Sequence, residues 1–247
     1  MEEDPGCSRH RLQVGGERAL DGESPGRCGR CDTRLPPAIP DRSLCAVCRR
    51  GGGLPRIRSV FDYHTDTLAR EWILALKHRP RPDLALHLGA LLADRLLQVE
   101  AQLEKKEVPE ILLSNVPAHP LRRFERGYDQ AKLLALGLLK ALEKNPRSDV
   151  PRLSVRYVPL LRRVRWTAPQ GSPGARTRAA NVSGAFRARR RKAREVAGKR
   201  LWLIDDVVVS GASVRACQRA LSGFGLGSFQ VLALARAEVG RRDSGPW

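Results

Sequence analysis

The sequence lacks the features of a secreted or membrane protein. Its first residues are acidic rather than basic and no apolar run follows them, so no secretory signal is visible. The longest apolar stretches, such as residues 84–93, are interrupted by a polar residue and stop far short of the roughly 18 apolar residues that a membrane helix needs. We therefore expect a cytoplasmic protein without membrane insertion.

Two common nucleotide-binding loops are also missing. No G-x-x-x-x-G-K-[ST] motif occurs, which excludes a P-loop ATPase. The glycines of residues 223–227 follow an expected helix and precede an expected strand, the reverse of a dinucleotide-binding fingerprint. What remains is a chain of 247 residues, 42% hydrophobic and 29% charged, which is too apolar for a disordered protein and long enough for one domain plus a small module.

Acidic residues are scarce in one part of the chain. The whole sequence has 45 Lys and Arg against 26 Asp and Glu, a net charge of +19. Residues 152–200 contain 15 of the basic residues and one acid, and their densest part is the run Arg187–Arg194. Such an excess indicates polyanionic partners, although a solvated arginine-rich surface has the same composition. The sequence leaves both interpretations open.

Four of the six cysteines form a C-x2-C-x13-C-x2-C pattern, made by Cys28, Cys31, Cys45 and Cys48. Each C-x-x-C pair offers two thiolates to one ion, and two pairs complete a tetrahedral zinc site. Because all four ligands come from the protein, the zinc would be structural and would stabilise a segment too short and polar to fold alone. An iron or redox site is the alternative. The single cysteines, Cys7 and Cys217, are expected to be inert.

Shifts in composition divide the chain into segments. Residues 1–25 are polar and glycine-rich and are expected to form a disordered tail, followed by the zinc ribbon at residues 26–50. Beyond a Gly-Pro linker, apolar patterning predicts strands at residues 57–63, 111–116, 157–161, 201–204 and 229–235. It predicts helices from residues 65–66 with a Leu68, Trp72, Leu76 stripe, from residue 83, and at residues 128–142 and 213–224. This alternation predicts an α/β fold, a parallel sheet with helices on both faces.

The most informative segment follows the strand predicted at residues 201–204. Asp205 and Asp206 come directly after it, and a short loop with Ser210, Gly211 and Ser213 then opens a helix. Free N–H groups and the positive end of a helix dipole favour phosphate, and adjacent carboxylates suit ribose hydroxyls or magnesium. Taken alone, an acidic pair at a strand end is also typical of a turn cap; the strand before it and the helix after it favour a binding site.

The string LWLIDDVVVSGAS resembles the phosphoribosyl-pyrophosphate motif of type I phosphoribosyltransferases. The chain from Cys28 to Ala237 is similar to the ComF family, which joins an N-terminal zinc ribbon to such a domain, here residues 56–240. Further landmarks are Phe61–Tyr63, Leu76-Lys77, the stretch Val116–Gln130, and Gln170 with Arg178, Asn181 and Ala185-Phe186.

The resemblance implies a role for each landmark. Asp205 and Asp206 would contact the ribose hydroxyls as the catalytic pair, with Mg²⁺ bound alongside the phosphoribosyl pyrophosphate. The segment Val209, Ser210, Gly211, Ala212 and Ser213 would surround the 5-phosphate. Arg122 and Arg126, on the loop after Val116, would face the pyrophosphate, and Gln170, Arg178 and Asn181 would belong to a mobile flap.

The chain departs from the family pattern at the phosphate loop. Val209 stands where some type I enzymes place an acidic general base, and Asn115 and Tyr128-Asp129 replace the usual residues. Two hypotheses follow. The first is a phosphoribosyltransferase that transfers the phosphoribosyl group to an unidentified acceptor. The alternative is a ComF-type competence protein without turnover, which binds single-stranded DNA during DNA uptake and works with other competence proteins.

Overall fold

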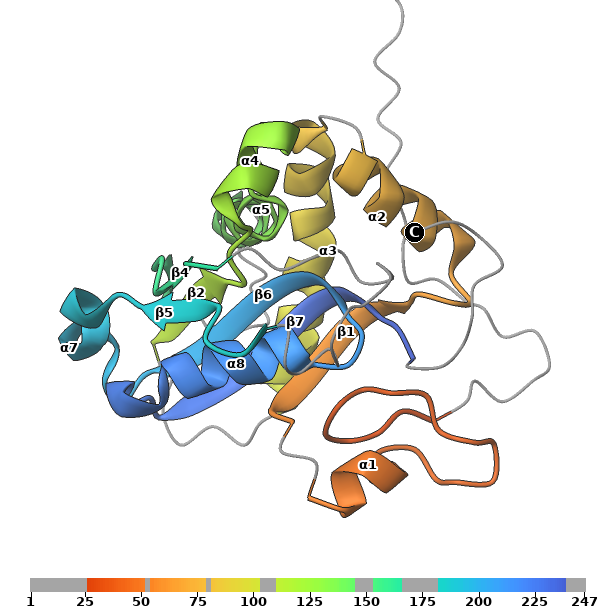
Figure 1. Cartoon of the computed structure of the whole chain (residues 1–247). Coiled ribbons are helices and arrows are strands. Elements are labelled where there is room, and N and C mark those ends of the chain that lie inside the picture. Colours follow the sequence, from red (N-terminus) through yellow and green to blue (C-terminus); the bar gives the residue numbers. More distant parts are fainter. Residues whose placement is uncertain are drawn as a thin grey trace, which may run out of the picture.

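The computed structural model describes residues 26–51, 54–78, 81–102, 110–144, 153–165 and 182–238. Its centre is a five-stranded sheet in the order β1-β7-β6-β2-β3, and all four pairings are parallel (Figure 1). The strands are β1 Arg56–Asp62, β2 Ile111–Asn115, β3 Val155–Tyr157, β6 Arg200–Val208 and β7 Ser228–Arg236. The expected parallel α/β sheet is thereby confirmed.

One face of the sheet is covered by three helices, α2 (Thr67–His78), α3 (Pro82–Ala101) and α5 (Gln130–Lys144). Alternate residues of each strand point to the same face, and those on this side form one buried cluster with the helices. Helices α3 and α5 touch at two glycines: a Cβ at Gly89 would lie 2.5 Å from the Leu138 nitrogen, and one at Gly137 would lie 2.3 Å from the Leu86 carbonyl oxygen. Only glycine permits this approach.

The opposite face is covered by shorter elements, so helices lie on both faces as expected. Helix α8 (Ala212–Ala220) packs there in front of the sheet in Figure 1, followed by the 3-10 turn η2 (Ser222–Phe224). Beside them lie the antiparallel hairpin β4 (Leu161–Arg163) and β5 (Phe186–Ala188), then η1 (Arg190–Lys192) and α7 (Ala193–Val196). The cysteine-containing segment with helix α1 (Ala46–Arg49) joins the same buried cluster.

Some predicted elements were wrong in detail. The strand expected at residues 157–161 is two strands, because β3 ends at Tyr157 in the main sheet and β4 begins at Leu161 in the hairpin. The loop expected after Val116 contains a further helix, α4 (Pro120–Arg126), begun by Pro120 and ended by left-handed Gly127. Leu68 is 59% exposed, so the buried stripe of α2 is Ala69, Ile73 and Leu76 instead.

The most consequential difference concerns β6, which was expected to end at Ile204. The ladder to β7 continues past it, with Asp205 opposite Ala233 and Val208 opposite Arg236. The ladder to β2 stops where Asn115 faces Ile204. Asp205 and Asp206 therefore belong to the strand, at the point where β6 loses its neighbour on one side. Among the described helices none is long and apolar enough to cross a membrane.

Candidate functional site

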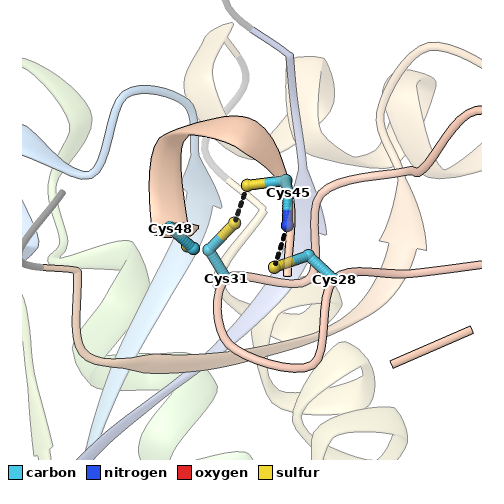
Figure 2. Close-up of side chains that lie close together, drawn as sticks. All are labelled: Cys28, Cys31, Cys45 and Cys48. Carbon is cyan, nitrogen blue, oxygen red and sulfur yellow. Dashed lines mark hydrogen bonds between the residues drawn. The ribbon is translucent and has the colours of Figure 1, made fainter. Parts of the chain in front are cut away.

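Two candidate sites were predicted, and the first is the cysteine cluster. The Sγ atoms of Cys28, Cys31, Cys45 and Cys48 lie within 4.8 Å of one another (Figure 2). The sulfurs of Cys31 and Cys45 are 3.6 Å apart. Four thiolates around one zinc at about 2.3 Å would lie about 3.8 Å apart, so the donor set fits a tetrahedral ion. The predicted pairing of the two C-x-x-C segments is confirmed.

Backbone donors prepare one of these cysteines for metal binding. Burial opposes ionisation of Cys28, but the N–H groups of Cys31, Cys45 and Arg30 outweigh it and lower the pKa of its thiol to about 7. The Cys45 N–H lies 3.3 Å from the Cys28 sulfur. Since a metal binds the thiolate, the lowered pKa favours Cys28 as a ligand at neutral pH, whereas burial raises the pKa of the Cys45 and Cys48 thiols.

The cysteine module, residues 26–51, is attached to the sheet rather than set apart from it. The Asp32 carboxylate is fully buried and accepts hydrogen bonds from the backbone N–H and hydroxyl of Ser59 in β1, at 2.8 and 2.6 Å. The Ile57 N–H donates to the Arg30 carbonyl oxygen at 2.8 Å. Leu35 of the module, and Leu54 just after it, are also buried in the core that contains α8 and β6. The module and the sheet therefore share one apolar core.

The second candidate site is the loop between β6 and α8. Gly211 has a φ of 70°, and a Cβ there would lie 2.3 Å from Cδ2 of Leu54, so the position requires glycine. Ser210 Oγ accepts a hydrogen bond from the Ala212 N–H at 3.4 Å. Ser210 and Ser213 are both partly exposed. The loop thus presents two hydroxyls and the first N–H groups of α8 at one end of the helix, an arrangement suited to phosphate.

Two carboxylates stand next to this loop. Burial, and secondarily the charge of Asp206, raises the pKa of Asp205 well above its ordinary value, and Lys77 of α2 opposes the rise. The Asp206 N–H donates to Asp205 Oδ1 at 3.0 Å, which fixes the side chain beside its own strand. Hydroxyl donors or a divalent cation would stabilise the charged form of two carboxylates that lie this close together.

Besides Lys77 of α2, basic side chains from two further elements interact with the acidic pair. Arg122 of α4 interacts electrostatically with Asp206, and burial lowers its pKa. Arg163 of β4 interacts with Asp205, and burial likewise lowers its pKa. Of the two predicted arginines, Arg122 shows this link, whereas Arg126 donates a hydrogen bond at 2.8 Å to Oε1 of Gln130, the first residue of α5. Both arginines lie on α4, not on a loop.

Sequence reasoning missed Lys77 and Arg163 as members of this site. Lys77 appeared in a family landmark without a role, and Arg163 was one basic residue among many between residues 152 and 200. Their electrostatic interaction with Asp205 depends on the tertiary structure, because α2 and β4 are far from β6 in the sequence. The predicted flap residues Gln170, Arg178 and Asn181, the tail at residues 1–25 and Cys7 lie outside the described residues.

Two of the unusual residues, Asn115 at the end of β2 and Asp129, hold the loop between β2 and α4. The Tyr157 hydroxyl donates to Asn115 Oδ1 at 2.6 Å, and Asn115 Nδ2 donates to Asp129 Oδ1 at 3.2 Å. Asp129 Oδ2 accepts from the Ala118 N–H at 3.1 Å. Burial raises the pKa of Tyr157 to about 12, so it stays a donor. Asn115 and Asp129 thus replace the usual residues with a connected polar network that sets the path into α4.

A groove with a volume of about 1290 Å³ lies elsewhere, at the C-terminal end of α8. Its basic lining residues are Arg162, Arg187, Arg189, Arg190, Arg191, Lys192 and Arg219. Residues 205–213 do not line it, and Lys192 is paired with Glu195 at 2.7 Å. The densest basic run of the sequence therefore lines a surface at the opposite end of α8 from the serine loop.

Replacing Asp205 with Asn should raise the melting temperature at neutral pH. Because its pKa is raised, the folded chain holds this proton to a higher pH than the unfolded chain, and stability is lost as pH rises from about 3.9 to the folded pKa. Asn avoids that loss, and each 1 kcal/mol gained corresponds to about 2 to 4 °C. Melting curves across this range, with the exposed Asp94→Asn as control, should show a gain for Asp205→Asn that disappears in acid. An unchanged or lower melting temperature at neutral pH would contradict this account.

Comparisons with known proteins bear on what these sites do. No family model matches the chain. Competence protein F of Haemophilus influenzae is 32% identical over 131 residues, which span 53% of this chain and about half, 52%, of that protein. DNA utilization protein YhgH is 27% identical in Escherichia coli K12 and 29% in Salmonella typhimurium, in each case over 241 residues, covering 86% of this chain and 97% of the relative. The resemblance to the ComF family is confirmed.

A comparison of structures adds one solved protein. The structure titled as the allosteric regulatory enzyme of purine biosynthesis aligns with 67% of this chain and 30% of its own, at 18% identity and a TM-score of 0.39. The ComF relatives are named for competence and DNA utilization, whereas that neighbour is named for biosynthesis.

Proposed function

We propose that this chain binds phosphoribosyl pyrophosphate with Mg²⁺ at the edge of the sheet where β6 continues beyond β2. The proposal further assigns it transfer of the phosphoribosyl group to an unidentified acceptor, with release of pyrophosphate. The observation that carries it is the acidic pair beside the serine loop at the start of α8, with two arginines from other elements that interact electrostatically with that pair. In this proposal the acids contact the ribose hydroxyls, the serine loop contacts the 5-phosphate and the arginines contact the pyrophosphate.

The charge of each group determines which part of the ligand we expect it to contact. Asp205 and Asp206 accept hydrogen bonds from the ribose hydroxyls, and the segment Val209–Ser213 surrounds the 5-phosphate. Arg122 and Arg163 interact with the acidic pair from α4 and β4, so they stand where a departing pyrophosphate needs cations. Asp205 and Asp206 would help to hold the Mg²⁺ that accompanies the ligand, and the ion would supply further positive charge there.

Val209 limits the chemistry that the loop itself performs. Its side chain packs against the core on the α3 side, and its carbonyl oxygen accepts a hydrogen bond from Arg236. An isopropyl group neither accepts nor donates a proton, so no general base comes from this position. Turnover therefore requires an acceptor that needs no proton removal by residue 209.

Calorimetry tests the binding half of this proposal. Titration of the purified chain with phosphoribosyl pyrophosphate in Mg²⁺ should show saturable binding that is lost when Mg²⁺ is left out. The same titration with ribose 5-phosphate should show weaker binding, because the pyrophosphate contacts are missing. Equal heats with and without Mg²⁺, or no binding at all, would refute the proposal.

We further propose zinc as the ion of the cysteine module, because four thiolates in tetrahedral spacing are typical of structural zinc. The ion would hold the two C-x-x-C segments together and take no part in the transfer. Sulfur ligation on all four sides leaves no position for substrate.

A second candidate function is binding of single-stranded DNA, favoured by the basic groove and by the relatives named for competence and DNA utilization. Base stacking in the groove is restricted. Phe186 is 5% exposed and lies under the Arg163 guanidinium, and Phe224 is 7% exposed. Tyr157 is engaged with Asn115, and Trp166 lies outside the described residues. Binding would therefore depend on phosphate contacts and show slight sequence preference.

Binding of an oligodeoxythymidylate should weaken steeply with salt. The logarithmic slope is about −0.7 per phosphate neutralised, so the double variant Arg187→Ala, Arg191→Ala should bind less tightly and have a slope smaller in magnitude by about 1.4. The double variant Arg49→Ala, Arg50→Ala, exposed on the cysteine module, is the matched control and should leave the slope unchanged. Fluorescence anisotropy measures both. An affinity that does not change with salt would rule out the groove as a nucleic-acid surface.

A further inference from the structure

A buried guanidinium connects the cysteine module to the serine loop. Arg236, the last residue of β7, is 6% exposed. Its Nε donates to the carbonyl oxygen of Cys31 at 3.0 Å. Its Nη1 donates to the carbonyl oxygens of Val208 and Ala237, both at 2.7 Å, and also to that of Val209. One side chain thus contacts the backbone of Cys31, a predicted metal ligand, and the backbone of the two residues that precede Ser210.

These contacts set the direction of the loop's N–H groups. In a planar trans peptide the C=O and N–H bonds point to opposite sides. With the Val209 carbonyl directed at Arg236, the N–H of Ser210 points away from the guanidinium. The Val208 carbonyl is held in the same way and also accepts from the Ala237 N–H at 3.0 Å. Arg236 therefore fixes the orientation of the peptides that enter the phosphate loop.

A second, apolar contact reaches the loop from Leu54, which follows the module and is hydrogen-bonded to it. The Leu54 side chain lies against Gly211, where a Cβ would be 2.3 Å from Cδ2 of Leu54. The Leu54 carbonyl accepts a hydrogen bond at 2.8 Å from Nε of Arg30, which lies between the first two cysteines of the metal cluster. The polar and the apolar contact therefore both start from the Cys28–Cys31 segment.

We propose that Arg236 is a positioning residue that makes the conformation of the Val208–Gly211 loop depend on metal occupancy of the cysteine module. A bound ion fixes the Cys28–Cys31 segment and with it the Cys31 carbonyl. Without the ion that acceptor moves, and a buried guanidinium that loses a partner must find another, which releases the Val208 and Val209 carbonyls. The consequence for phosphoribosyl pyrophosphate rests on the proposed function; the change in the loop does not.

The chain contains a matched control for this role. Arg58 of β1 is equally buried, at 7% exposed, and also donates to the first cysteine segment, through Nη2 to the Gly29 carbonyl oxygen at 3.0 Å. Its Nη1 donates to the Ile57 carbonyl oxygen at 2.7 Å, so these two contacts lie in the module and in β1, away from the loop. Arg58→Lys therefore disturbs the module as Arg236→Lys does, without touching residues 208–211.

Hydrogen–deuterium exchange of the full chain tests the proposal without any ligand. In the wild type, removing the metal with a chelator should speed amide exchange in peptides covering residues 205–213 by about tenfold or more, the change expected for one lost charged hydrogen bond. In Arg236→Lys the same peptides should exchange fast before chelation and change little after it. In Arg58→Lys the response to chelation should equal that of the wild type. Peptides of α3 and α5 report whether the sheet stays folded.

Binding provides a second readout after the chelator is removed and Mg²⁺ is restored. Wild-type affinity for phosphoribosyl pyrophosphate should fall by about tenfold on metal loss, and that of Arg236→Lys should already be low. Loop exchange in the wild type that ignores the metal overturns the coupling, even if Arg236→Lys fails to fold. If exchange responds but no ligand binds, the coupling holds and the proposed function fails. If Arg236→Lys keeps the full response to chelation, Arg236 is not the connection.

Discussion

The double variant Asp205→Asn, Asp206→Asn should lose at least about tenfold in affinity for phosphoribosyl pyrophosphate with Mg²⁺. Asn keeps the shape of each side chain but removes its charge, and a charged hydrogen bond contributes about 1.5 to 3 kcal/mol. Each carboxylate that bonds a ribose hydroxyl or helps hold the cation adds a loss of this size, so the double variant should fall toward about a hundredfold. Calorimetry on the metal-loaded chain measures the change.

The serine loop supplies an independent arm of this test. Ser210→Ala and Ser213→Ala each remove a hydroxyl donor to a charged phosphate, and each should weaken binding by about tenfold. Ser222→Ala is the matched control, because Ser222 is exposed in η2 and its hydroxyl donates to the Arg219 carbonyl oxygen. Cys217 is a poor control, since this buried thiol feels the charge of Asp205.

Asp94→Asn serves as the control for the acidic pair, because Asp94 is an exposed carboxylate on α3. It should bind the ligand like the wild type. Wild-type affinity in the double variant would mean that the ribose does not lie at Asp205 and Asp206. If the acid variants lose affinity while both serine variants bind normally, the 5-phosphate does not lie at the serine loop.

Loss of the metal should have the largest effect on stability. We expect one zinc per chain, and Cys45→Ser should lose it together with the folded structure of residues 26–51. Burial of Leu35 in that module and of Leu54 just after it links the module to the core, at about 1.5 to 3 kcal/mol for each side chain. The remaining sheet should stay folded, because β1 keeps its ladder to β7, but its melting temperature should fall by roughly 10 °C.

Elemental analysis and melting curves measure these two effects. Cys217→Ser is the matched substitution, since Cys217 is buried outside the cluster, and it should keep the zinc. Protein purified without chelator that contains no zinc, or a Cys45→Ser variant that binds zinc as tightly as the wild type, would contradict the assignment of the metal centre.

Sequence patterns determined the architecture wherever the signal was local. Cys28, Cys31, Cys45 and Cys48 could be grouped from spacing alone, because a C-x-x-C turn constrains its own two thiols. The alternation of apolar strands and helices gave the parallel sheet, since each strand buries both faces. The run from Asp205 to Ser213 could be found for the same reason: its acids, glycine and serines lie in one short segment.

Contacts between distant segments were decided only by the tertiary structure. No local rule could extend β6 past Ile204, because the extension depends on β7 remaining paired after β2 has ended. The electrostatic interaction of Lys77 and Arg163 with Asp205 likewise depends on the tertiary structure, because α2 and β4 are far from β6 in the sequence. Arg236 bonds to Cys31, 205 positions away in the sequence. A side chain's charge and size can be read from the sequence, but its partners are fixed only when packing brings the elements together.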